Sequence, residues 1–122
     1  MRNALNWFEI PVTDMDRAVR FYSTVLGVEL MPGPGMGDAR MAMFPAEGGV
    51  GGALLQAEGW VPSIAGPAVY LNCDGDLDTP LSRVEAAGGK ILVPNTDIGE
   101  NGRFAFILDT EGNRIGFHAS KT

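Results

Sequence analysis

The chain has 122 residues, a length that fits one domain with a substantial buried core. Its formal net charge of −6 argues against a nucleic-acid partner, because phosphate backbones attract basic surfaces. We expect a cytoplasmic protein without a membrane partner, since no apolar run approaches the roughly 20 residues that span a bilayer, the N-terminus lacks a signal-peptide pattern and the one cysteine, Cys73, cannot form an intrachain disulfide.

The first half of the chain predicts one strand, a helix and three further strands. Residues 5–12 alternate as in a strand, and Thr13 or Asp14 can cap the helix that follows. Gly27 suits a left-handed helix stop. Three short strands are expected at 28–31, 39–44 and 50–56, separated by a PGPGMG loop and a turn. The buried stripe of the helix is predicted to contain Met15, Ala18, Val19, Tyr22, Val25 and Leu26.

The second half repeats this order of elements after a Gly- and Pro-rich linker. A strand over 68–73 leads through DGDLD to a helix whose predicted stripe is Leu77, Leu81, Val84 and Ala87, and Gly88 and Gly89 end that helix. A strand is expected at 90–93, a loop at 94–101 and a strand at 103–108. The DTEGN sequence supplies a tight turn before a last strand at 114–118.

The repeat indicates two associated units. Each unit alone would leave one face of its sheet uncovered, so two units in one short chain are expected to share a concave surface. We call this hollow the cup. It is a natural place for a ligand.

Three segments carry a resemblance to a known family: IPVTDMDRAVRFYSTVLG, EAAGGKIL and DTEGNRIGFH. They resemble the vicinal oxygen chelate superfamily, which includes glyoxalases, extradiol dioxygenases, fosfomycin-resistance transferases and bleomycin-resistance proteins. The resemblance implies an α+β fold of two βαβββ modules whose mixed sheet curls around the central cup, often completed by a second subunit. On this basis residues 1–122 form one domain, with modules at 4–56 and 67–119 and a linker at 57–66.

The resemblance also implies where a metal would be bound. Enzymes of the family carry one ligand near the start of the first strand of each module and another in the last strand of each. The matching positions here are Trp7, Gly52, Ala68 and Gly116, whose side chains cannot coordinate a metal. No cofactor is therefore expected, although a carboxylate-bound Mg²⁺ or Mn²⁺ stays open as an alternative.

Strand parity predicts which side chains face the cup. The mixture of aromatic, carboxylate, amide and imidazole groups over apolar residues is typical of a small-molecule pocket. The ligand-binding candidates are Trp7, Met43, Tyr70, Asn72 and Arg114, and the catalytic candidates are Glu9 and His118.

Each candidate also has a structural interpretation. Glu9 is either a functional acid or the ion-pair partner of Arg114 or Arg40. Trp7 is a stacking platform for a planar ligand, an anchor of a dimer interface or a packing residue. His118 fits an edge of the core as well as a ligand site. Tyr70 and Asn72 can instead satisfy neighbouring backbone groups.

Three functions follow from these interpretations. The favoured one is a protein that binds a small apolar or aromatic molecule in the cup without the family's usual metal. The second is a lyase, isomerase or dioxygenase of the glyoxalase kind with Glu9 as general base. The third is a dimeric interaction module with a filled cup. A homodimer is expected from the resemblance and from two tryptophans, Trp7 and Trp60, in positions that favour exposure.

Overall fold

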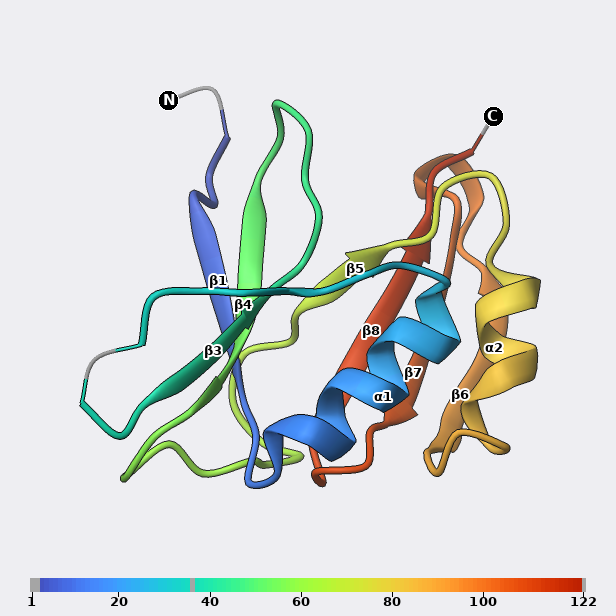
Figure 1. Cartoon of the computed structure of the whole chain (residues 1–122). Helices are drawn as coiled ribbons and strands as arrows, with labels where there is room; N and C mark the ends of the chain where they lie inside the picture. Colours follow the sequence, from blue (N-terminus) through green and yellow to red (C-terminus); the bar gives the residue numbers. More distant parts are fainter. Residues whose placement is uncertain (1–2, 36, 122) are drawn as a thin grey trace.

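The computed structural model describes residues 3–35 and 37–121, and it contains two helices and two four-stranded sheets (Figure 1). The first module places a helix between its first and second strands, and the second module repeats that order. The elements are β1 (Trp7–Pro11), α1 (Met15–Leu26), β2 (Met31–Pro32), β3 (Arg40–Met43), β4 (Gly51–Gln56), β5 (Tyr70–Asn72), α2 (Asp78–Val84), β6 (Lys90–Asp97), the 3₁₀ turn η1 (Gly99–Asn101), β7 (Arg103–Leu108) and β8 (Arg114–Ala119).

The two sheets have the same topology. Their strand orders are β1-β4-β3-β2 and β5-β8-β7-β6, and in each sheet the first strand of the module runs parallel to the last. The predicted α+β fold of two βαβββ modules is therefore confirmed. The sheets remain separate four-stranded units and do not form a closed wall.

Helix α1 begins and ends where its sequence predicts. The Asp14 side chain caps it by accepting a hydrogen bond from the Arg17 amide at 3.1 Å, so Asp14 is the cap of the two candidates. Gly27 ends it in the left-handed conformation, with φ of 67°. Phe21, which was missing from the predicted stripe, is buried as well. Its ring makes an edge-to-face contact with that of Tyr22, and both rings belong to the buried hydrophobic core.

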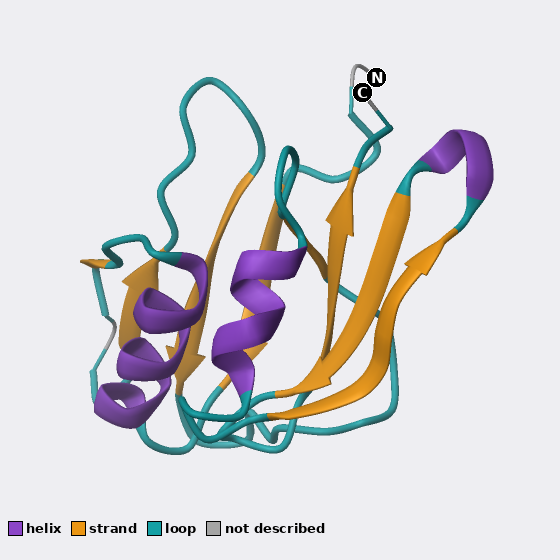
Figure 2. Cartoon of the chain, turned by 90° about the vertical axis from the view of Figure 1, so that its right-hand side faces the viewer, coloured by secondary structure: helices purple, strands orange, loops and turns teal. Residues whose placement is uncertain are grey.

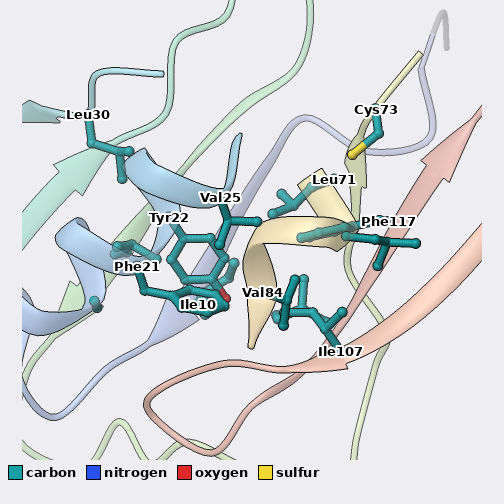
Figure 3. Close-up of a cluster of buried hydrophobic side chains, with 14 of the residues drawn as sticks. Ile10, Phe21, Tyr22, Val25, Leu30, Leu71, Cys73, Val84, Ile107 and Phe117 are labelled. Carbon is teal, nitrogen blue, oxygen red and sulfur yellow. The ribbon is translucent and has the colours of Figure 1, made fainter. Parts of the chain in front are cut away.

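One hydrophobic core joins the two modules. Helices α1 and α2 lie side by side (Figure 2), and side chains from both enter a single cluster of buried residues. Figure 3 shows Ile10, Tyr22 and Val25 from the first module near Val84 and Ile107 from the second. Because the apolar faces of both modules are buried together, neither module is an independent domain.

A buried polar network fastens the β7–β8 turn to helix α1. The Tyr22 hydroxyl donates to Asp109 at 2.6 Å, and both residues are buried. The other Asp109 oxygen accepts the Glu111 and Asn113 amides, each at 2.8 Å. Burial, together with the Asp109 charge, raises the pKa of Tyr22 well above its usual value, so the phenol stays protonated and remains a donor.

Glu111 completes the same junction at the N-terminus of α1. Its carboxylate accepts hydrogen bonds from the Thr13 and Asp14 amides, both at 2.9 Å, and pairs with Arg17 at 2.7 Å. The Glu111 carboxylate thus binds the two amides that lead into α1, and its negative charge lies at the positive end of the helix dipole. Burial alone would raise the pKa of Glu111, but the hydrogen bonds from Arg17, Asp14 and Thr13 lower it from 4.5 to about 2.

The low pKa of Glu111 predicts an acid-sensitive junction. Because the folded pKa lies below the usual value of 4.5, the stabilisation is complete above that pH and is lost as pH falls towards 2. Over that window we expect wild type to lose about 1–2 kcal/mol of unfolding free energy relative to Glu111→Gln. Urea unfolding of both proteins at several pH values measures this difference. An equal gap between them throughout the window would contradict the prediction.

Several predicted boundaries need correction. Helix α2 covers only Asp78–Val84, so Leu77 and Ala87 of its predicted stripe lie outside it, and β5 covers only Tyr70–Asn72 of the strand expected at 68–73. The segment 94–101, expected to be a loop, continues strand β6 as far as Asp97. Pro94 is tolerated because β6 is an edge strand with irregular register against β7. The strand expected at 28–31 is reduced to Met31–Pro32, because the Val28 amide instead bonds to the Ser23 carbonyl at the end of α1.

No helix in the part of the chain that the structure describes has the length and hydrophobicity needed to cross a membrane.

Candidate functional site

The main candidate site is an apolar cleft between the two modules, with a volume of about 660 Å³. Phe8, Val28 and Phe44 line it from the first module. Val69, Leu71 and Cys73 line it from the second. This volume and apolar lining are typical of small-molecule sites, which commonly lie where two structural units meet.

A ring lying over a glycine shapes each wall of the cleft. Phe8 pairs with Gly52 across β1 and β4, and Tyr70 pairs with Gly116 across β5 and β8. A Cβ at either glycine would collide with the ring of its partner, so only glycine allows the ring to lie across the neighbouring strand. The two pairs do not occupy equivalent positions of the repeat, because Phe8 shares a face of its sheet with the buried Ile10, whereas Tyr70 lies on the opposite face from the buried Leu71.

The rings of Phe8 and Tyr70 each pack against a further aromatic ring. The centroids of Phe8 and Phe44 lie 5.7 Å apart, and those of Tyr70 and Phe106 lie 5.6 Å apart. Such spacing is favourable for aromatic pairs and limits movement of the rings. The cleft thus has an aromatic surface on both modules.

The polar groups of the cleft lie at the end of β5 and directly after it. Asn72 lines it, and its side-chain oxygen accepts the Asp74 amide at 2.8 Å. Asp74 and Asp76 are exposed and also line the cleft. Burial, followed by these two carboxylates, raises the pKa of the Cys73 thiol to about 11, so the thiol is protonated and unreactive at neutral pH.

The structure distributes the predicted site residues over several places. Tyr70 and Asn72 line the cleft. Glu9 and Arg114 line a smaller hollow of about 260 Å³ beside the linker. Trp7 and Met43 line a third hollow, of about 380 Å³, on the first module.

His118, the remaining candidate, lies on β8. Its Nε2 atom is 2.6 Å from the carbonyl oxygen of Asn101, a contact that fits an N–H donor on that nitrogen. The carbonyl belongs to η1, so the imidazole fastens this turn to the sheet. This contact supports the structural interpretation of His118.

Glu9 does not form either of the ion pairs considered for it. Among the described residues Arg40 pairs with Asp16, whereas Arg114 donates to the Gly66 carbonyl and its guanidinium lies 5.5 Å from the ring centre of Phe106. Glu9 instead accepts a hydrogen bond from the Trp7 indole at 3.3 Å. It is only half-buried, so water can solvate its charge without a cationic partner.

The side chains at the four positions that the resemblance relates to metal ligands do not fit a metal. Trp7 carries an indole, Ala68 a methyl group, and Gly52 and Gly116 lack side chains and are covered by Phe8 and Tyr70. Nowhere in residues 3–35 and 37–121 do three or more His, Cys, Asp or Glu side chains lie together in a way that could hold a metal ion. These positions offer no donor set for metal chemistry.

Strand parity alone did not predict the walls of the cleft. In the strand expected at 68–73, Val69, Leu71 and Cys73 alternate with the cup-facing candidates Tyr70 and Asn72, which places them on the core face, and Leu71 and Cys73 are buried. They also line the cleft because the two sheets remain separate beside that face. The one signal available in the sequence was the presence of Gly52 and Gly116 in last strands, where side chains are expected.

Comparisons with known proteins agree with this architecture. A family model described as the Glyoxalase/Bleomycin resistance protein/Dioxygenase superfamily matches residues 4–117. A "Putative glyoxylase CFP32" of Mycobacterium tuberculosis is 30% identical over 115 residues, which cover 91% of this chain and 43% of that protein. A "Glyoxylase-like domain-containing protein" of Didymella fabae is 33% identical over 121 residues, covering 93% of this chain and 91% of that protein.

The solved structures add a likeness in fold. TnmS3, an antibiotic binding protein from Streptomyces sp. CB03234, superposes with a TM-score of 0.67 at 24% identity, over 98% of this chain and 97% of that chain. The chain spans less than half of the mycobacterial relative but nearly all of TnmS3. The likeness therefore extends to the arrangement of both modules.

Proposed function

Because the chain belongs to the glyoxalase/bleomycin resistance protein/dioxygenase superfamily, we propose that it binds a small apolar or aromatic molecule between its modules without the family's metal. The observation that carries this proposal is the cleft of about 660 Å³ with aromatic and aliphatic walls from both modules. Burial of a ligand's apolar surface there supplies affinity, and the few polar groups fix its orientation. The antibiotic-binding function named for TnmS3 is consistent with a binding role in this fold.

The proposal includes a homodimer. Trp7 is 43% exposed, Met31 is 53% exposed and Tyr70 is 50% exposed, although all three are large apolar side chains. Exposed apolar surface of this kind favours association. Trp7 and Met31 line the hollow on the first module and Tyr70 lines the cleft, so a second copy that covered all three would lie beside both.

The catalytic alternative requires Glu9 beside the reacting molecule. Glu9 instead lies in the smaller hollow beside the linker, at the hydrogen bond from Trp7. Glu9→Gln is therefore a control for the binding proposal. If the cleft is the site, this substitution leaves the affinity for a cleft ligand unchanged.

Titration with naphthylmethanol, an uncharged aromatic probe, tests the proposal. We expect saturable binding by calorimetry, with one molecule per chain, because the ring can bury its apolar surface against the aromatic walls. The methyl NMR signals of Val69 and Leu71 should shift, since both side chains line the cleft. Mass spectrometry should recover the probe unchanged. Absence of saturation, or shifts confined to residues outside the cleft, would overturn the proposed function.

A further inference from the structure

The charges around the cleft are of one sign. Asp74 and Asp76 are exposed and line it, and the described residues that line it include no Lys, Arg or His. The whole chain carries a formal net charge of −6. The potential at the cleft is therefore expected to be negative.

Hydrogen bonds hold both carboxylates at the cleft. One Asp74 oxygen accepts the Ser120 amide at 2.6 Å, and one Asp76 oxygen accepts the Thr79 amide at 3.0 Å. The side chains are thus fixed in place while they stay in contact with solvent. Carboxylates already fixed in this way lose little conformational freedom on meeting a ligand.

The cations nearest these carboxylates lie outside the cleft. Arg103 and Lys121 line a neighbouring hollow that Asp76 also lines. Arg83 on α2 contributes to lowering the pKa of Asp76, so some of its positive charge acts there. Its guanidinium is directed to the Val25 carbonyl, at 3.5 Å, and Arg83 does not line the cleft. A positively charged group inside the cleft would therefore meet the carboxylates without displacing a bound arginine.

We propose that the cleft selects aromatic molecules that carry a cationic amine, with the ring between the apolar walls and the ammonium group at Asp74 and Asp76. This inference rests on the proposed function and specifies its ligand class. The aromatic surfaces of Phe8, Phe44 and Tyr70 favour the same ligands, because ring faces attract cations. An aromatic carboxylate would meet repulsion at the rim.

Three probes that share one ring system but differ in charge separate the effect of the charge on affinity from the effect of the ring. Naphthylmethylamine is cationic at neutral pH, naphthylmethanol is uncharged and naphthoate is anionic. At low salt we expect the amine to bind about fivefold more tightly than the alcohol, and naphthoate to bind more weakly than either. The preference for the amine should shrink as salt is added, because salt screens exposed charges.

Substitutions at the two carboxylates identify the source of the preference. In a protein carrying Asp74→Asn and Asp76→Asn, the side-chain oxygens can still accept the Ser120 and Thr79 amides, so the local structure is kept. The amine should lose its advantage while the alcohol binds as before. Asp38→Asn, at an exposed position that does not line the cleft, serves as the control.

The outcomes separate this inference from the function on which it rests. Equal binding of amine and alcohol to the wild-type protein would overturn the charge selection and leave the apolar site standing. An amine preference that survives both Asn substitutions would likewise overturn it. Failure of all three probes to bind would overturn the proposed function and this inference together.

Discussion

Replacing Asp109 by alanine is expected to lower the free energy of unfolding by about 3–4 kcal/mol. The substitution leaves the buried Tyr22 hydroxyl and the Asn113 amide without their acceptor. It also removes the acceptor of the Glu111 amide and frees the turn that fastens the second module to α1. Urea unfolding followed by circular dichroism measures the loss.

Two variants test whether the network causes this loss. Tyr22→Phe removes only the hydrogen bond to Asp109 and should cost about 1–2 kcal/mol, because Asn113 still donates to the same oxygen. Asp38→Ala removes an exposed carboxylate and should change stability by less than about 0.5 kcal/mol. A loss below about 1 kcal/mol for Asp109→Ala would show that the network contributes little.

Ala68→Trp is expected to weaken binding of naphthylmethanol at least tenfold, or about 1.4 kcal/mol. Ala68 lines the cleft and is exposed, so an indole at this position can occupy part of the cavity without displacing core side chains. The probe and the indole would compete for the same apolar walls. Calorimetric titration of the variant measures the change in affinity.

Ala65→Trp is the matched control for that substitution. Ala65 is also exposed, but it lines the smaller hollow beside the linker. Binding to this variant should match wild type within about twofold, and both variants should keep the wild-type unfolding free energy within about 0.5 kcal/mol. Tight binding to Ala68→Trp, or equal losses in the two variants, would place the ligand elsewhere.

The order of helices and strands was predictable because short sequence patterns mark the ends of the helices and the course of the strands in both halves of the chain. Asp14 and Gly27 bracket a helix by capping chemistry, and alternating side chains mark the strands that follow. These signals act over a few residues, so sequence alone reveals them. The extension of β6 through Pro94 was not predictable, because it depends on that strand lying at the edge of its sheet.

The candidate site was predictable only in part. Parity places Trp7 and Glu9 on one face of β1, but it does not tell how far the two sheets stand apart. Because the sheets are separate, Glu9 and Trp7 line other hollows than Tyr70 does. The cleft is lined instead by side chains that strand parity places on the core face, such as Leu71. Distances between modules depend on how α1 docks on the β7–β8 turn, and no local pattern encodes them.

The Glu111 contacts at the start of α1 also bear on how this duplicated protein can be divided. A fragment that ended before the turn between β7 and β8 would leave the Thr13 and Asp14 amides without the acceptor that Glu111 supplies. An excised N-terminal half is thus a poor autonomous unit, despite containing a complete strand–helix–strand plan. Splitting the chain for complementation assays, or exchanging halves between homologues, must carry this turn and its helix together.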